Sequence, residues 1–388
     1  MSATRIGIVT KEWPPAMYGG AGVHVVQLTQ ALRTVPGIEV DIHCFGGART
    51  DGAFGYDTPA EFSSANPALQ AIATDLAIAQ NLQGVDVIHS HTWYANMAGH
   101  TASLLYGTPH IVSAHSLEPL RPWKAEQLGG GYKISSWAEK TAYEAAAAII
   151  AVSDGMRADV LSAYPEVDPA KVVTIRNGVD TTKFAPNYDD SVLQEYGITG
   201  RYAMFVGRIT RQKGLSHLLR AWKNVPAEYG LVLAAGSPDE ETIGNEVAAL
   251  IAELQSTRSN VWWIKEMLPH DKLTAALTQA DLFLCPSIYE PLGIVNLEAM
   301  GCETAVLASR VGGIPEVVAH KETGELVNYT TDHAHFESDL TAAISSLMAD
   351  PQLLEQYGKA GRARAQSEFG WDAVAAQTIA LYKSVINK

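Results

Sequence analysis

The chain has 388 residues, of which 47% are apolar and 18% charged, a composition typical of a well-packed globular protein long enough for two domains. Its formal net charge of −14 argues against a nucleic-acid partner or an anionic membrane surface, because both require a basic face. Any phosphate-bearing ligand must therefore be held by local cations set against the overall negative field.

Cysteine usage and the first residues indicate the compartment. Cys44, Cys285 and Cys302 are widely spaced and flanked by apolar residues, which predicts buried free thiols in a reducing compartment rather than a metal site. The chain begins with a predicted strand and shows no apolar signal-peptide region. Its longest apolar run, 145–152, is too short to span a bilayer. We therefore expect a cytoplasmic protein without a membrane partner.

The first half of the chain alternates short β-branched runs with helical patterns. The expected strands are 5–10, 40–45, 86–89, 110–115, 148–152 and 172–176. The expected helices are 21–33, 67–81, 94–106, 135–147 and 155–163. This alternation is typical of a doubly wound parallel α/β sheet.

The second half repeats the alternation after a stretch without a strong period, 181–199, which is predicted to be a linker region. The expected strands are 202–206, 231–235, 261–264, 282–286 and 305–309. The expected helices are 215–223, 240–256, 271–280, 293–301, 335–348, 352–368 and 371–387. The sequence therefore predicts two successive Rossmann-like units, whose ligands would lie beyond the carboxyl ends of the strands.

The strongest motif spans Ser287–Cys302. Pro291 and Gly293 set a turn before a predicted helix whose N-terminal amides suit a phosphate or a sugar hydroxyl. Glu290 precedes this helix and Glu298 lies eight residues later, inside it, so the two carboxylates would be spread along a ligand. One could hold a sugar and the other a ribose diol. The alternative is a loop–helix junction with two solvated glutamates.

A basic loop, Gly207–Gly214, follows the expected strand 202–206. Arg208 can donate to two phosphate oxygens and Lys213 supplies a mobile point charge, whereas Arg211 is expected at the surface. A diphosphate leaving group needs such neutralisation when no divalent metal is present, and the chain has no Asp-x-Asp pair for Mg²⁺ or Mn²⁺. The alternative is a solvated basic loop.

Other candidates lie in the first half. Gly19 and Gly20 would let the backbone approach a phosphate or sugar, or they simply start a helix. His115 ends a strand and could contact a sugar, or it is an ordinary polar strand end. His89 and His91 could suggest a metal, but no third ligand stands beside them in the sequence. His24 is interpreted as structural.

Several motifs together resemble those of the retaining glycosyltransferases of the GT-B fold, specifically the glycogen-synthase-like glucosyltransferases of actinobacteria. The motifs cover essentially the whole chain: Glu12-Trp-Pro-Pro, Tyr18-Gly-Gly-Ala-Gly-Val-His24, His89-Ser-His-Thr-Trp93, Ser113-Ala-His115, Arg176-Asn-Gly-Val-Asp180, Gly207-Arg208, Lys213-Gly214, and Glu290 through Glu298. The last is the Glu-x₇-Glu element of that family.

The resemblance implies a GT-B architecture of two Rossmann-like, doubly wound domains facing a central cleft. Residues 1–180, together with a C-terminal helix 371–388, would form the acceptor-side domain, and residues 181–370 the nucleotide-sugar-donor domain. Catalytic roles fall on His115, Arg208, Lys213 and Glu290. Substrate binding falls on Gly19, Gly20, Gly293, Ile294, Val295 and Glu298. No metal or other cofactor is implied.

In that reading Arg208 and Lys213 hold the donor diphosphate, Glu290 the donor sugar and Glu298 the ribose, while His115 lines the sugar pocket. The donor would be ADP-glucose, which is favoured, or UDP-glucose. The acceptor would be glucose 1-phosphate, giving maltose 1-phosphate, or the end of a glycogen or other α-glucan chain. Family analogy also suggests a homodimer.

The first loop departs from the longer bacterial glycogen synthases, because Met17 stands where they carry a lysine. Relatives with Tyr-Gly-Gly-Ala-Gly at this place resemble enzymes that form α-maltose 1-phosphate. An acceptor phosphate would need its own cation, and the candidates are Arg121, Lys124, Lys133 and Arg157. Four alternatives stay open: a retaining transferase with a mannosyl or inositol-phosphate type of acceptor, a sugar-nucleotide epimerase, a hydrolase that uses Glu290 and Glu298, and a non-catalytic sensor.

Overall fold

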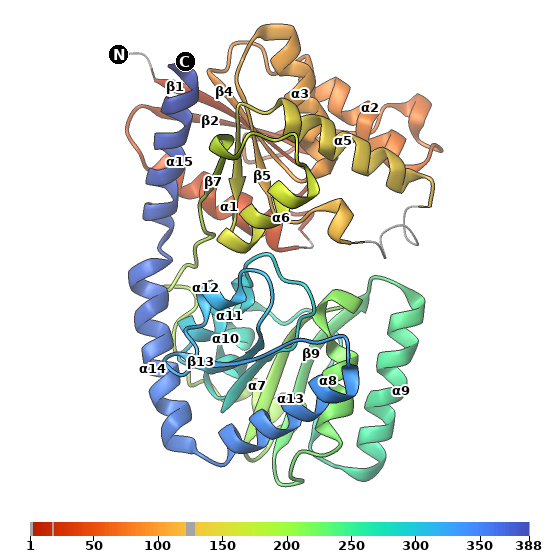
Figure 1. Ribbon diagram of the computed structural model, residues 1–388, viewed down its shortest axis with the longest axis vertical. Coiled ribbons are helices and arrows are strands. Elements are labelled where there is room, and N and C mark those ends of the chain that lie inside the picture. The colour runs from red at the N-terminus through yellow and green to blue at the C-terminus, as the bar shows by residue number, and fades with distance from the viewer. Residues whose placement is uncertain (1–2, 18, 122–128, 388) are drawn as a thin grey trace. The chain divides into compact units, whose positions relative to one another are not determined.

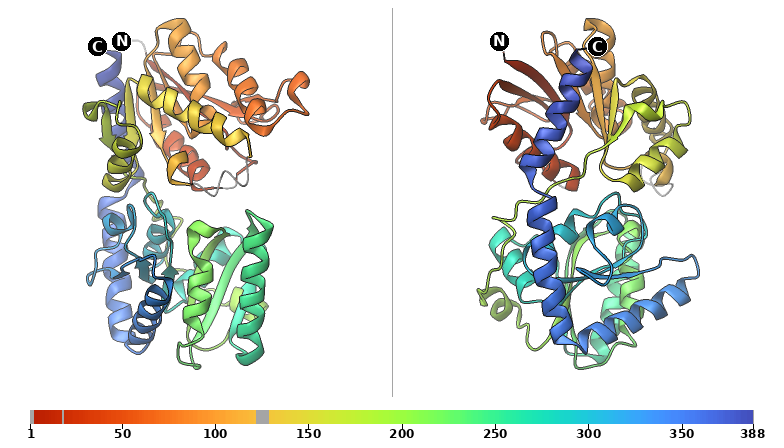
Figure 2. Two further views of the ribbon diagram at one scale, coloured as in Figure 1. Left: turned by 45° about the vertical axis from the view of Figure 1, so that its right-hand side comes forward. Right: turned by 60° about the vertical axis from the view of Figure 1, so that its left-hand side comes forward.

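A computed structural model describes residues 3–17, 19–121 and 129–387. The chain forms two compact units, Met1–Gly178 with Trp371–Lys388 (unit 1) and Val179–Gly370 (unit 2). The boundary falls two residues before the expected one. Each unit contains one parallel sheet with helices packed against it (Figure 1, with further views in Figure 2). The expectation of two Rossmann-like α/β domains is confirmed.

Unit 1 contains, within the described residues, a seven-stranded parallel sheet of order β3-β2-β1-β4-β5-β6-β7. Its strands are β1 Thr4–Thr10, β2 Ile38–Phe45, β3 Phe54–Tyr56, β4 Val87–His91, β5 His110–Ala114, β6 Ala148–Ala151 and β7 Val172–Thr174. Its α-helices are α1 Gly20–Arg33, α2 Pro67–Ala79, α3 Trp93–Tyr106, α5 Gly131–Ala145, α6 Asp154–Ala163 and α15 Trp371–Ile386.

Unit 2 contains a six-stranded parallel sheet of order β10-β9-β8-β11-β12-β13 among the residues described there. Its strands are β8 Tyr202–Ile209, β9 Gly230–Pro238, β10 Val261–Ile264, β11 Leu282–Cys285, β12 Ala305–Ser309 and β13 Gly324–Val327. Its α-helices are α7 Ser191–Tyr196, α8 Leu215–Trp222, α9 Glu241–Thr257, α10 His270–Thr278, α11 Ile294–Gly301, α12 Ile314–Val317, α13 His333–Met348 and α14 Pro351–Glu368.

Four elements differ from the sequence-based expectation, and one of them is the short helix α12, which was not predicted. The edge strands β3 and β13 were not predicted, because runs of three and four residues are too short for a reliable periodicity. The expected linker 181–199 is partly wrong, since it contains α7. Val192 of this helix is fully buried, and the nearby Asn187 amide donates to Thr278 Oγ1 at 3.0 Å. This stretch therefore packs as part of unit 2.

The last helix, α15, completes the core of unit 1. Val374, Ile379 and Tyr382 pack in the same apolar cluster as residues of β1, β2 and α1. The Tyr382 hydroxyl also forms a hydrogen bond of 2.7 Å with Nδ1 of His89, in the middle of β4. Residues nearly 300 positions apart are thus joined in one core.

The three cysteines are free and buried, as the sequence predicted. None of the described helices combines the length and the apolar character that a membrane crossing requires.

A buried pair of carboxyl groups lies between α5 and the loop after β5. Glu118 and Glu139 are 0% and 1% exposed, and Arg121 forms an ion pair with Glu118. Glu139 Oε1 accepts a hydrogen bond from the Glu118 amide at 2.8 Å and another from the Tyr164 hydroxyl. Burial, and then the charge of Glu118, raise the pKa of Glu139 from 4.5 to about 8, so this side chain carries its proton at neutral pH.

The raised pKa of Glu139 predicts a pH-dependent stability. Between pH 4.5 and pH 8 the folded protein holds a proton that the unfolded chain has lost. The contribution of this group is therefore complete below pH 4.5 and falls by about 1.4 kcal/mol per pH unit up to the folded-state pKa. Glutamine keeps the acceptor oxygen and cannot ionise, so Glu139→Gln should lose less stability than the parent protein between pH 6 and 8.5. Urea unfolding at both pH values measures this, and equal losses would contradict the assignment.

Candidate functional site

Four of the predicted site residues gather at the carboxyl edge of the sheet of unit 2. Arg208 lies at the end of β8, and Lys213 ends the short 3₁₀ helix that follows, Arg211–Lys213. Glu290 follows β11, and Glu298 lies in α11. Lys213 Nζ donates to Glu290 Oε2 at 2.7 Å. The charge of Lys213 also acts on Glu298, and that of Arg208 acts on Lys213.

The loops that carry Lys213 and Glu290 are interlocked by their backbones. The Ile288 amide donates to the Gln212 carbonyl at 2.9 Å. Gly214 has a φ of +64°, and a Cβ there would lie 2.0 Å from the Pro286 carbonyl oxygen. Only glycine therefore fits where the loop after β8 crosses the loop after β11. This close approach sets the spacing between the Lys213 and Glu290 side chains.

The Glu290 segment is also fixed by the loop after β12. The Gly313 amide donates to the Glu290 carbonyl at 3.0 Å, and a Cβ at Gly312 would lie 2.0 Å from the same oxygen. Ser287 Oγ donates to Glu290 Oε2 at 3.2 Å. The Glu290 carboxylate thus accepts from a cation and a hydroxyl before any ligand binds.

Lys213 remains a cation despite its burial. Burial by itself lowers the pKa of Lys213, but the charge of Glu290 and the hydrogen bond to its carboxylate outweigh that effect and raise the pKa. The side chains of Lys213 and Glu290 are 21% and 10% exposed. The pair is therefore a nearly dry, charge-assisted hydrogen bond.

Arg208 is held in a different way. Its Nη1 donates to Asp239 Oδ1, at the end of β9, at 2.5 Å, and its side chain is 49% exposed. The guanidinium has five N–H groups, so after the contact to Asp239 other donors remain available to a ligand that arrives from solvent. Sequence reasoning missed Asp239, because nothing in the sequence indicates that β9 ends beside β8.

Helix α11 provides backbone amides at its start and, further along, the half-buried carboxyl group of Glu298. Gly293 caps this helix with a φ of +92°, and Ile294 and Val295 form its first turn, where amides have no preceding helical carbonyl. Asn296 is fully buried, and its side-chain amide has no hydrogen-bond partner among the described residues. Burial raises the pKa of Glu298 to about 7, although the charge of Lys213 opposes this shift.

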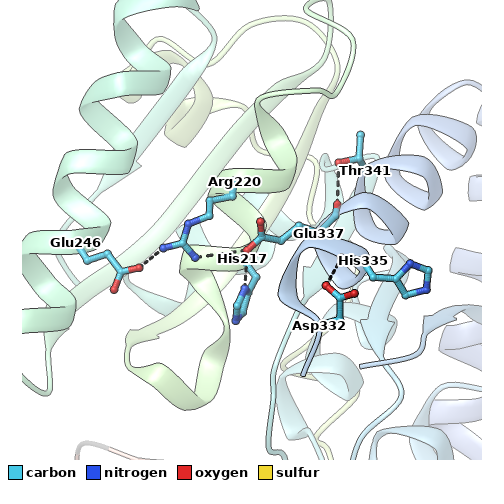
Figure 3. A network of polar contacts seen from close by, with 7 residues as sticks. All are labelled: His217, Arg220, Glu246, Asp332, His335, Glu337 and Thr341. Carbon is cyan, nitrogen blue, oxygen red and sulfur yellow. Dashed lines mark hydrogen bonds and ion pairs between the residues drawn. The ribbon is translucent and has the colours of Figure 1, made fainter. Parts of the chain in front are cut away.

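A polar network anchors the helix that follows Lys213. Arg220 of α8 forms ion pairs with Glu246 of α9 and Glu337 of α13, and His217 Nδ1 lies 2.8 Å from the same Glu337 carboxylate (Figure 3). Beside this network is a cavity of about 270 Å³, lined by residues that include Arg211. The network ties α8 to both neighbouring helices and so fixes the position of the basic loop.

In unit 1 the backbone before α1, which was expected to approach a phosphate or a sugar, contacts the side chain of Glu12 instead. The Gly19 amide donates to Glu12 Oε2 at 2.7 Å, and α1 begins at Gly20. Glu12 is 7% exposed. A carboxylate at the N-terminus of a helix is favoured by the helix dipole. The sequence analysis assigned no role to Glu12, and Tyr18 lies outside the described residues.

His115 belongs to a cluster of histidines in unit 1. His91 Nδ1 and His115 Nε2 share a hydrogen bond of 2.9 Å, and the ring of His24 lies 4.7 Å from that of His115. His89 Nε2 forms a hydrogen bond with Ser113 Oγ at 2.8 Å. No third group stands beside the His89–His91 pair in the sequence, but the fold brings His24 and His115 to it from α1 and from the residue after β5.

Among the described residues, the cations considered for an acceptor phosphate either bind other groups of the protein or are exposed on a helix. Arg121 is paired with the buried Glu118. Arg157 donates to the carbonyls of Val172 and Pro169 at 3.1 and 3.2 Å. Lys133 is exposed on α5, and Lys124 lies outside the described residues.

Comparisons with known proteins place the chain among glycosyltransferases. Residues 18–183 match the family model "Glycosyltransferase Family 4", and residues 194–364 match "Glycosyl transferases group 1". The chain is 52% identical over 387 residues to an α-maltose-1-phosphate synthase of Mycolicibacterium smegmatis, with 98% of this chain and 99% of the relative covered.

Solved structures show the same fold at low identity. A sucrose-phosphate synthase from Thermosynechococcus elongatus superposes with a TM-score of 0.82 at 24% identity, covering 99% of both chains. The catalytic domain of starch synthase IV from Arabidopsis thaliana, solved with ADP and acarbose, gives a TM-score of 0.76 at 18% identity and covers both chains completely. Both neighbours have the GT-B fold, which confirms the predicted fold class.

The close approach at Gly214 generates a stability prediction with a matched control. Gly197 has the same φ of +64°, but a Cβ there would meet nothing within 4 Å. Alanine at either position costs about 1–2 kcal/mol of backbone strain, whereas Gly214→Ala must also move the Pro286 carbonyl away. We expect Gly214→Ala to lower the free energy of unfolding more than Gly197→Ala does, by about 1–3 kcal/mol. Urea unfolding of both variants measures the difference, and equal losses would contradict the interlocked loops.

Proposed function

Because the chain belongs to the family 4 glycosyltransferases of the GT-B fold, we propose that it is a retaining glucosyltransferase that forms α-maltose 1-phosphate from ADP-glucose and glucose 1-phosphate. The observation that carries the donor assignment is the buried Lys213–Glu290 pair at the start of α11. The acceptor assignment is supported by the name of the relative that is 52% identical over nearly the whole chain.

Donor binding would exchange the partners of the two charged side chains. Lys213 would turn from Glu290 to the diphosphate, and Arg208 would add donors that Asp239 leaves unused. Glu290 would then be free to accept hydrogen bonds from the donor sugar. The diphosphate brings the negative charge that replaces Glu290 beside Lys213, so no buried cation is left unpaired. The amides of Gly293, Ile294 and Val295 would add further donors at the helix N-terminus.

Glu298 would bind the ribose hydroxyls of the nucleotide. It lies in α11, close enough to Lys213 to be affected by the charge of that side chain. A carboxylate that binds the ribose would need to lie near the diphosphate in this way. His115, Gly19 and Gly20 belong to unit 1, which we assign to the sugar and the acceptor. The pKa of His115 is lowered by burial to about 4, so this side chain would contact hydroxyl groups as a neutral imidazole.

The reaction would proceed without an enzymic nucleophile. The bond between the glucose C1 and the phosphate oxygen breaks, and a bond from C1 to O4 of the acceptor forms on the same face. The acceptor proton passes to an oxygen of the departing diphosphate, which leaves as ADP. Electrostatic stabilisation of that leaving group is then the main catalytic contribution, and Lys213 and Arg208 supply it.

The role of Lys213 can be tested against a neighbouring cation. Lys213→Ala removes the buried charge that faces the diphosphate and should lower kcat about a hundredfold or more, as the loss of a preorganised oxyanion donor does. Arg211→Ala removes an exposed cation two residues away. The Arg211 side chain forms a loose ion pair with Glu240, with 3.6 Å between Nε and Oε2. That control should stay within about threefold of the parent rate. Circular dichroism checks the folding of both variants, and near-normal turnover by folded Lys213→Ala would refute the assignment.

The substrates can be identified by product analysis. The protein is incubated with ADP-glucose or UDP-glucose, each together with glucose 1-phosphate, with glycogen or with no acceptor, and the products are followed by ¹H and ³¹P NMR. We expect ADP release and an α-1,4-linked disaccharide phosphate from ADP-glucose and glucose 1-phosphate. Elongation of glycogen alone, or faster transfer from UDP-glucose, would overturn the substrate assignment. An altered sugar nucleotide without acceptor would indicate an epimerase and overturn transfer itself.

A further inference from the structure

Three histidines of unit 1, two of them buried and one partly exposed, come together from three separate elements. His24 lies on α1, His91 ends β4, and His115 follows β5. One ring nitrogen from each lies within 4.8 Å of the others. The ring centroids are 4.7 Å apart for His24 and His115, 5.2 Å for His91 and His115, and 5.6 Å for His24 and His91. The three rings therefore surround a common point.

Several nitrogens of this cluster lack the partners that buried polar atoms normally have. His24 is 3% exposed and His91 is 0% exposed. Within the described part of the chain, neither nitrogen of His24 makes a hydrogen bond of normal geometry. Asn177 lies near His24, and a side-chain hydrogen bond between them raises the pKa of His24, but no contact of the Asn177 side-chain oxygen meets normal hydrogen-bond geometry among these residues. Each unsatisfied buried group costs about 1–3 kcal/mol, which calls for an explanation.

We propose that His24, His91 and His115 form a binding site for one Zn²⁺ ion or a similar divalent transition-metal ion. Three neutral imidazoles are a known ligand set for zinc, in which a fourth position stays open for water or another ligand. His24 and His91 are deeply buried, whereas His115 is partly exposed. The open position would thus face the solvent side of His115.

The geometry requires only small movements of the rings. Zinc–nitrogen bonds of about 2.0–2.1 Å in a tetrahedral arrangement place the nitrogens about 3.3 Å apart. The His91–His115 pair, at 2.9 Å, would open by a few tenths of an ångström and exchange its hydrogen bond for two bonds to the ion. The widest pair, at up to 4.8 Å, would close by about 1.5 Å through side-chain rotation.

Neighbouring groups hold the ligands in place and keep them available. His89 packs 4.2 Å from the His91 ring, and both of its nitrogens are already bonded, to Tyr382 and Ser113, so it supports the site rather than binding the ion. Burial and the neighbouring histidines lower the pKa of His24 and His91. The lone pairs of these rings are therefore free at neutral pH, as metal binding requires.

The proposal is tested by calorimetric titration of tag-free, chelator-treated protein with ZnCl₂. We expect one ion per chain with a dissociation constant of about 10 µM or tighter. His24→Asn and His91→Asn should each weaken binding at least about tenfold. His335→Asn, which removes a histidine of α13 whose side chain is 65% exposed, should bind as the parent does. Unchanged affinity in both cluster variants, or no binding by the parent, would overturn the proposal.

A second measurement needs no variant. X-ray absorption of the zinc-loaded parent protein should show three imidazole ligands with zinc–nitrogen distances of about 2.0 Å. Coordination by thiolate, or by oxygen alone, would overturn the site even if the titration showed one bound ion. Neither measurement depends on glycosyl transfer, so the metal site and the proposed function stand or fall separately.

Discussion

The buried ion pair between Lys213 and Glu290 is the interaction on which the arrangement of unit 2 depends. It joins the loops after β8 and β11, and it is nearly dry. Removing one member of such a pair leaves a buried charge without a partner, which costs about 3–5 kcal/mol. A ligand can separate the pair only if it replaces both partners at once. The proposed sugar diphosphate would do so, because its phosphates suit the lysine and its sugar hydroxyls suit the carboxylate.

The order of the strands explains why these side chains meet. In unit 2, β8 lies between β9 and β11. The strands β9 and β10 are added on one side of β8, and the later strands β11, β12 and β13 on its other side. Ligands of open α/β sheets bind at such a switch point, where the loops holding Asp239, Lys213 and Glu290 lie next to one another. Unit 1 has the same switch point, since β1 lies between β2 and β4. His24, His91 and His115 gather around it.

The sequence predicted most strands and helices, and it predicted the cluster of Arg208, Lys213, Glu290 and Glu298, because these residues follow strands within recognisable motifs. It did not predict contacts between distant segments. The partners of Arg208 and of Gly19, namely Asp239 and Glu12, depend on strand neighbours and side-chain rotamers. The meeting of His24 with His91 and His115 depends on how α1 packs across the end of the sheet. Periodicity and motif spacing describe each segment separately, so such pairings appear only in the folded chain.

The two switch points differ in charge, and this difference decides what each unit can bind. Unit 2 presents two cations, one of which keeps its charge despite burial. Unit 1 presents imidazoles, and burial lowers the pKa of His115 to about 4, so this group is neutral at pH 7. A neutral ring cannot balance the charge that develops on a departing diphosphate, whereas it can bond to a hydroxyl or bind a metal ion. In the proposed reaction the leaving group would therefore be held by unit 2, and the histidines of unit 1 would act through their lone pairs rather than through positive charge.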